Sequence, residues 1–153
     1  MNAGRGAVGK AAVIRAKERN GKIKASVIER TNTATLEGFV LGNVEVGAMV
    51  YTDEHGGYNG LSRSYGHSSV KHSVGEYVKG MAHTNGIEGF WAMLKRGYKG
   101  TYHPMSRKHL ARYVTESAGR HNVRNFDTIA QMATLAKGLD GKRLRYDDLI
   151  AAS

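Results

Sequence analysis

The sequence predicts an α/β domain in which helices pack on a mixed sheet. Three observations indicate this fold class: alternating apolar and polar runs on either side of Asn20-Gly21, a short apolar run over residues 48–52, and an amphipathic stripe within residues 85–97. Strands followed by helices in this order are typical of α/β domains. The length of 153 residues suits one domain, residues 1–153, with residues 106–153 as its C-terminal helical part.

The first predicted element is a β-hairpin. Residues 11–17 and 23–28 alternate apolar and polar side chains, as strands with one buried face do. The Asn20-Gly21 pair between them supplies the positive φ angles that a type I′ turn requires. We therefore expect two antiparallel strands joined at this turn.

A short helix is expected next. Thr33 is the expected N-cap, and the helix should end near Gly42-Asn43. Its apolar residues recur at spacings of three and four: Leu36, Phe39 and Val40.

A buried strand over residues 48–52 should follow and stop at Asp53-Glu54, before the glycines at 56, 57 and 60. Asp53 is therefore expected at the C-terminal end of a strand. Residues 65–72 are a further candidate strand, and residues 73–83 resemble a loop.

The clearest helix spans residues 85–97. Its apolar stripe lies at i, i+3, i+4 and i+7, formed by Ile87, Phe90, Trp91 and Leu94. A second helix is predicted from residue 107 to about 122, with Ser106 as its N-cap and Leu110, Tyr113 and Val114 facing inward. A third spans residues 127–137 and ends at Gly138. Residues 141–150 form a polar tail.

The charge balance points to a polyanionic partner. Lys and Arg exceed Asp and Glu by ten, so the surface field should attract nucleic acid. There is no apolar run long enough to span a bilayer and no export signal, and the absence of cysteine fits a cytoplasmic protein. Without cysteine, any metal must bind through oxygen or imidazole. His67, His72 and His83 lack the tight spacing of zinc ligands, so we do not interpret them as a zinc site. His72 and His83 are expected to hydrogen-bond near the site.

Two acids and one lysine form the candidate chemical group. Asp53 ends a strand, and Glu88 lies one turn into the predicted helix, with Lys95 on the same face two turns later. Two such carboxylates offer the oxygen ligands that Mg²⁺ or Mn²⁺ prefers. Structural alternatives remain open: Asp53 as a turn residue, Asn85 with Glu88 as a capping box, and Lys95 as a solvated side chain.

A set of short stretches is distinctive when taken together: residues 51–54, Gly57-Tyr58, residues 72–78 and, most specifically, residues 83–97, extended by 101–103, 106–110 and 120–122. These stretches resemble the DDE transposase domain of insertion sequences with a D, D, N/E, K signature. Thirty-four residues separate Asp53 from Glu88, close to the interval of this superfamily. The resemblance covers residues 4 to 150.

The resemblance implies a ribonuclease-H-like mixed sheet flanked by helices, in which three acids hold two Mg²⁺ or Mn²⁺ ions. Asp53 matches the second acid and Glu88 the third, both as metal ligands, with Asn85 as their neighbour and Lys95 as the basic partner. The implied reaction is metal-dependent DNA strand nicking and strand transfer, without a covalent enzyme intermediate.

This sequence departs from the family at its beginning. No acid precedes Glu18, so the first catalytic Asp and the first, central strand of the family's sheet are expected to be missing. The hairpin and the strand ending at Asp53 should then lack the neighbour between them, leaving a gap or a rearranged pairing. The chain alone is expected to be catalytically inactive.

The expected partner is double-stranded DNA, both transposon ends and target, in a bacterial-type cytoplasm at the nucleoid. Homo-oligomerisation is left open, and no membrane contact is expected. The alternative function is a non-catalytic DNA-binding remnant or an inhibitor of transposition. Phosphate contacts are expected from a run of basic residues: Lys95, Arg96, Lys99, Arg107, Lys108 and Arg112.

Overall fold

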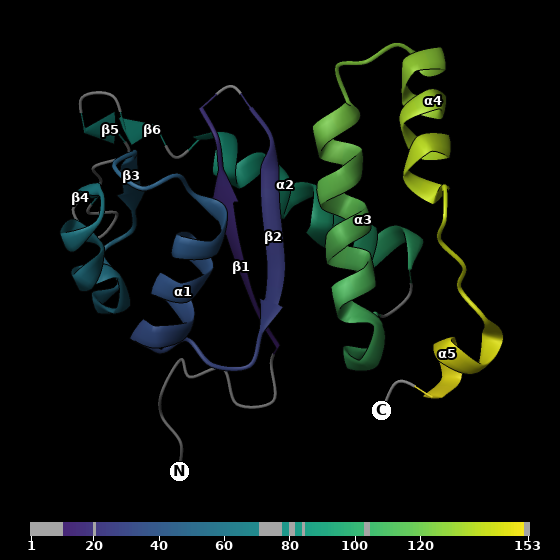
Figure 1. The fold of residues 1–153 in the computed structure, drawn as a ribbon, viewed down its shortest axis with the longest axis horizontal. Coiled ribbons are helices and arrows are strands. Elements are labelled where there is room, and N and C mark those ends of the chain that lie inside the picture. The colour runs from purple at the N-terminus through teal and green to yellow at the C-terminus, as the bar shows by residue number, and fades with distance from the viewer. Residues whose placement is uncertain are drawn as a thin grey trace.

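A computed structural model describes residues 11–19, 21–70, 78–79, 82–83, 85–102 and 105–151. The predicted α/β class is confirmed: the structure consists of small sheets and several helices (Figure 1). The strands are β1 (Ala12–Lys17), β2 (Ile23–Ile28), β3 (Met49–Thr52), β4 (Gly66–Ser69), β5 (Val78–Lys79) and β6 (Ala82–His83). The α-helices are α1 (Thr33–Asn43), α2 (Asn85–Arg96), α3 (Leu110–Val123), α4 (Thr128–Leu139) and α5 (Tyr146–Ala151). Shorter helical turns are η1 (Gly56–Arg63), η3 (Gly97–Thr101) and η4 (Arg107–His109).

The predicted hairpin is confirmed. β1 and β2 pair antiparallel in a register that runs from Ala12 opposite Ile28 to Lys17 opposite Ile23. Asn20 of the predicted turn lies outside the described residues. Because neighbouring side chains of a strand point to opposite faces, buried Ile14 faces α1 while Arg15 lies over the rings of α2. Helices therefore cover both faces of the hairpin (Figure 1).

One core cluster joins the hairpin to α2 and α3. Ile23 of β2, Phe90 of α2 and Ala118 of α3 are buried together, and Trp91 and Leu94 of α2 pack against them. Phe90 and Leu94 belong to the stripe that predicted this helix, so the helical periodicity identified side chains that do reach the core.

A second core cluster joins α1, η1 and β3. Val40, Leu61 and Tyr65 are buried together. At Gly57 of η1 a Cβ atom would lie 2.6 Å from Leu36 Cδ1, so the close approach of η1 to α1 requires glycine there. The 3-10 turn itself was not predicted, since its glycines and polar residues carry no helical periodicity.

The strands form separate pairs rather than one sheet. Among the described residues, β1–β2, β3–β4 and β5–β6 are three two-stranded sheets, and β3 runs parallel to β4. The hairpin and β3 are therefore not hydrogen-bonded to each other within the described residues. A ribonuclease-H-like topology stays a prediction.

Residues 48–52 were predicted to form a buried strand. The strand is confirmed as β3, but its predicted burial is wrong. Met49 is 59% exposed, and the rest of β3 is half-buried. The reason is the pairing: among the residues that the structure describes, β3 has a neighbouring strand on one edge only, so its apolar run is covered incompletely.

Two predicted helix caps are also wrong. Asn32, not Thr33, caps α1, because its Oδ1 accepts a hydrogen bond from Thr35 N at 2.9 Å. Ser106 makes no side-chain capping bond, and the helix it precedes starts as the 3-10 turn η4 before α3 begins. Asp127 caps α4 by accepting from Ala130 N at 2.9 Å.

Two segments expected to be irregular contain regular structure. The predicted loop over residues 73–83 includes β5 and β6, which pair antiparallel, and its other residues lie outside those described. The predicted polar tail contains α5. All three elements are short, and short elements contain too few residues for a periodic pattern.

Candidate functional site

Asp53 directly follows β3, as predicted. Thr52 Oγ1 and His67 Nε2 lie 2.9 Å apart and link the last residue of β3 to the second residue of β4. Asp53 Oδ1 accepts a hydrogen bond from His55 N at 3.2 Å, so Asp53 also has the turn role that was left open. Its side chain is exposed and therefore accessible to a ligand.

His55 and Tyr58 lie beside Asp53, and sequence reasoning had not assigned them. His55 Nδ1 accepts a hydrogen bond from Gly57 N at 3.1 Å, which leaves Nε2 as the atom able to donate when the ring is neutral. The rings of His55 and Tyr58 meet edge to face at 6.1 Å. Burial, and then the negative charge of Asp53, raise the pKa of Tyr58. The signal for both residues was their position in the turn that follows Asp53.

The other predicted acid lies on α2. Asn85 and Glu88 are part of this helix, and the last turn carries Lys95 and Arg96. The structure does not describe the side chains of Asn85, Glu88 and His83. His72 lies wholly outside the described residues. Convergence of the Asp53 and Glu88 carboxylates therefore stays a prediction.

A divalent cation is compatible with what the structure describes. Asp53 offers an exposed carboxylate, the donor type that Mg²⁺ and Mn²⁺ prefer. Among the described residues no three His, Asp or Glu side chains gather into a metal-binding group. Asp53 thus fits as one ligand, and further ligands would have to come from side chains beyond those described, such as Glu88.

The predicted DNA-binding residues are solvent-exposed cations on α2, η3, η4 and α3. They are Lys95, Arg96, Lys99, Arg107, Lys108 and Arg112. The ammonium group of Lys108 donates to the carbonyl of Ile150 at 2.5 Å, so this lysine also holds α5 in place. Lys108 is therefore a weaker candidate for a phosphate contact than the others.

A second group of basic residues was not recognised from the sequence. Burial lowers the pKa of His121 first, and the charges of Arg124, Lys17 and Arg15 lower it further. These residues come from β1 and from α3 with the turn after it, so only the fold brings them together. Burial also lowers the pKa of Arg15 to about 10.

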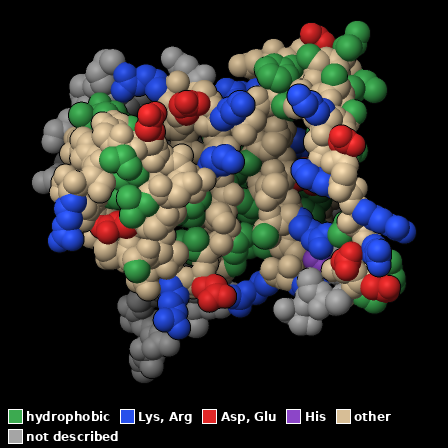
Figure 2. All heavy atoms as spheres, viewed as in Figure 1, with side chains coloured by type: hydrophobic (Ala, Val, Ile, Leu, Met, Phe, Trp, Pro, Cys, Tyr) green, Lys and Arg blue, Asp and Glu red, His purple; other side chains and the backbone are tan. Residues whose placement is uncertain are grey.

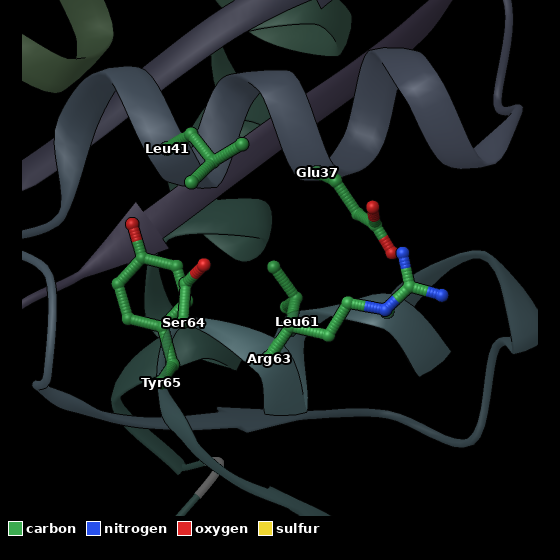
Figure 3. Close-up of a pocket in the computed structure, with 7 residues that line it drawn as sticks. Glu37, Leu41, Leu61, Arg63, Ser64 and Tyr65 are labelled. Atoms are coloured by element: carbon green, nitrogen blue, oxygen red, sulfur yellow. The ribbon is translucent and has the colours of Figure 1, made fainter.

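A small cavity lies between α1 and η1, away from these groups. Its volume is about 200 Å³, and the Glu37 side chain points toward Arg63 at its mouth (Figure 3). The residues around it are Glu37, Leu41, Gly60, Leu61, Arg63, Ser64 and Tyr65. None of the predicted site residues lines this cavity, so we assign it no role in the candidate site.

Comparison with known families decides the identity of the chain. A family model described as the ISXO2-like transposase domain matches residues 1–122. The chain belongs to this family. This transposase domain is of the DDE insertion-sequence type, as the resemblance implied, although the match stops at residue 122 rather than near 150. Comparison with curated proteins and with solved structures gives no significant match.

Proposed function

We propose that this transposase domain acts in the DNA strand nicking and strand transfer of insertion-sequence transposition. The family match over residues 1–122 carries the proposal, because that span includes Asp53, Glu88 and Lys95. The exposed carboxylate of Asp53 at the end of β3 and the position of Glu88 in α2 are compatible with it.

In this proposal Asp53 and Glu88 hold divalent cations, Mg²⁺ or Mn²⁺. When bound, two such ions would supply stabilisation of negative charge in an in-line phosphoryl displacement. Asn85, in the first turn of α2, assists these two metal ligands. Lys95 lies two turns from Glu88 and holds a DNA phosphate. His55 Nε2 lies in the turn after Asp53, where it is able to donate to a phosphate oxygen.

The proposed partner is double-stranded DNA. The net charge of +10 supports this choice, and the exposed cations of α2, η3 and α3 offer phosphate contacts. Within the described residues no helix is long and apolar enough to cross a membrane. We place the protein in a bacterial-type cytoplasm, at the nucleoid when it is bound to DNA. For its fold we propose a ribonuclease-H-like sheet.

We further propose that these 153 residues alone bind DNA without cutting it. No acid precedes Glu18, so the chain supplies two of the three acids that the family uses. Its second candidate function is therefore a DNA-binding protein that inhibits transposition.

The test uses the purified chain, a labelled duplex and a supercoiled plasmid, with Mg²⁺ or Mn²⁺ present. We expect duplex binding without nicking or strand transfer. If the chain carries out metal-dependent strand transfer and Asp53→Ala abolishes it, the proposal that the chain binds DNA without cutting it is overturned. The same result would support a catalytic role. Absence of DNA binding even at low salt would contradict both.

A further inference from the structure

Two cations meet where the tip of the β1–β2 hairpin lies beside the end of α3. Lys17, the last residue of β1, is directly opposite Ile23 of β2. The backbone of Ile23 is hydrogen-bonded to the side chain of Asn122, near the end of α3. Arg124 follows, and its Nη1 donates to the carbonyl of His121 at 2.6 Å. The fold thus brings an ammonium and a guanidinium group to one end of the molecule, at the top of Figure 1. We call Lys17 and Arg124 the hairpin-tip cations.

A buried histidine lies behind the hairpin-tip cations. His121 is 9% exposed, and its Nε2 has no hydrogen-bond partner among the described residues. Its ring meets that of Phe90 edge to face at 6.3 Å, and the guanidinium carbon of Arg15 lies 5.4 Å from the centroid of the same Phe90 ring. Burial first, and then the positive charges of Arg124, Lys17 and Arg15, lower the pKa of His121. A positive field therefore surrounds this ring.

The hairpin-tip cations lack a counter-charge. In the part of the chain that the structure describes, neither Lys17 nor Arg124 forms an ion pair. Glu18 follows Lys17 in the sequence, but neighbouring side chains of a strand point to opposite faces. The carboxylate of Glu18 turns into the hairpin loop instead, where Oε2 accepts a hydrogen bond from Lys22 N at 3.4 Å. Since like charges repel each other, an anion from outside would stabilise this arrangement.

The chemistry and accessibility of these two groups suit a phosphate. A guanidinium group donates parallel N–H bonds to an oxyanion, and an ammonium group acts on it as a compact charge. Arg124 is exposed and Lys17 is half-buried, so an anion in solution reaches both. One group ends a strand and the other follows a helix. Because Asn122 ties this strand pair to this helix, the two groups keep a fixed spacing.

The position of the hairpin tip indicates which phosphate it takes. Arg19, in the turn after β1, lies over the ring of Tyr51, with its guanidinium carbon 6.0 Å from the centroid. Tyr51 belongs to β3, the strand that Asp53 directly follows. The basic tip of the hairpin therefore adjoins the strand that leads to the candidate metal ligand. A DNA backbone that reaches Asp53 would pass Lys17 and Arg124.

The surface beyond α3, on the side away from the hairpin, is apolar instead. There α4 presents Ile129, Met132 and Leu135 to solvent, at 81%, 66% and 64% exposure. Apolar side chains follow the outer edge of α4 at the upper right of Figure 2. Apolar groups offer phosphates neither charge nor hydrogen bonds, so we expect DNA on the hairpin side of α3.

We propose that Lys17 and Arg124 hold a backbone phosphate of the DNA strand that leads to Asp53, with His121 buried behind them. The inference rests on the proposed function, DNA binding, and adds a contact on β1 and at the end of α3 to the predicted cations of α2, η3, η4 and α3. A phosphate held there brings negative charge close to His121. Such a charge favours the protonated ring, so DNA should raise the pKa of His121.

Titration of a labelled duplex with the full chain at several salt concentrations is the first test. Lys17→Gln and Arg124→Gln should each reduce the slope of log affinity against log salt by about 0.9, and weaken binding about five- to tenfold at about 0.1 M salt. Lys24→Gln is the matched control. Lys24 follows Ile23 in β2 and pairs with Ala16, so it lies on the other face of the same hairpin. It should change neither quantity, and all variants should keep the circular dichroism spectrum of the parent.

Histidine ring resonances, followed by NMR between about pH 5 and 8, provide the second test. The signal that is lost in His121→Phe identifies His121. We expect a short duplex to raise the pKa of His121 by about one unit or more in the parent chain and in Lys24→Gln. The shift should be absent when Lys17→Gln and Arg124→Gln are combined. Inorganic phosphate, at the same concentration of phosphate groups, should leave the pKa unchanged.

The outcomes separate this site from the proposed function. If the parent chain binds the duplex while the salt slope and the pKa of His121 do not respond as described, Lys17 and Arg124 serve the fold alone and the inference is overturned. An equal shift with inorganic phosphate would assign the cations to free anions and also overturn it. A parent chain that binds no DNA at low salt would contradict the proposed function on which the inference rests.

Discussion

The side-chain amide of Asn122 makes two hydrogen bonds to the backbone of Ile23, a residue 99 positions earlier. Ile23 N–H donates to Asn122 Oδ1 at 2.7 Å, and Asn122 Nδ2 donates to the Ile23 carbonyl at 2.9 Å. Since β1 pairs with the other edge of β2, Asn122 satisfies backbone groups on the outer edge. It thereby joins the end of α3 to the start of β2.

Replacing Asn122 by Ala should lower the free energy of unfolding by about 1–3 kcal/mol, because two partly buried backbone groups lose their partner. Urea denaturation monitored by circular dichroism measures the change. Asn125→Ala is the control at an exposed asparagine nearby, with an expected effect within about 0.5 kcal/mol. Equal effects of the two substitutions would show that the paired bonds do not stabilise the fold.

His121 should make stability depend on pH. Its side chain is only 9% exposed, Nε2 lacks a hydrogen-bond partner among the described residues, and its pKa is lowered in the folded protein. The unfolded chain therefore binds the proton more readily, so stability should fall as pH decreases through about 6.5, by at most about 1.4 kcal/mol per pH unit.

Urea denaturation between pH 7.5 and 5 follows this effect. His121→Phe keeps an aromatic ring beside Phe90 and should reduce the pH dependence. A pH dependence that survives in His121→Phe would assign it to another group.

Arg15 should stabilise α2 against the hairpin through stacking. Its guanidinium carbon lies 4.8 Å from the ring centroid of Trp91 and 5.4 Å from that of Phe90. Arg15→Lys keeps the charge but loses the planar group. We expect it to reduce stability by about 0.5–2 kcal/mol.

Trp91 is the single tryptophan of the chain, so its fluorescence reports on this contact. Arg15→Lys should alter the emission of the folded protein, and Arg30→Lys, at an exposed arginine, should not. Unchanged emission and stability in Arg15→Lys would refute the stacking role.

Lys95 and Arg96 should contribute to DNA affinity through phosphates rather than bases. Replacing both by Ala should weaken binding to all duplexes alike and reduce the slope of log affinity against log salt by up to about 1.8, or 0.9 per phosphate. The control replaces Lys137 and Lys142, which lie beyond residues 1–122, by Ala and should leave the slope unchanged. Titration of a labelled duplex at several salt concentrations measures both. A salt slope that stays the same in the Lys95 and Arg96 variant would remove these residues from the DNA contact.

Periodicity in the sequence was sufficient to predict the hairpin, α1, α2, α3 and α4 to within a few residues. These elements repeat one local pattern over many residues. It was not sufficient to predict which side of α4 faces outward, because a stripe of apolar residues looks the same whether a core or solvent lies next to it. Which residue caps a helix depends on local backbone geometry. Around Asn32 and Ser106 the sequence offers neighbouring candidates and does not decide between them.

For the candidate site, the sequence by itself determined that Asp53 ends a strand and that Glu88 and Lys95 share a helix, since strand ends and helical spacing are local properties. His55 and Tyr58 lie near Asp53 because they belong to the same local turn, whereas only the tertiary structure decided that Arg15, Lys17 and Arg124 gather at His121. The contact of Asn122 with Ile23 is of the same kind. Such contacts join residues whose spacing along the chain carries no pattern, because packing in three dimensions, rather than periodicity, brings them together.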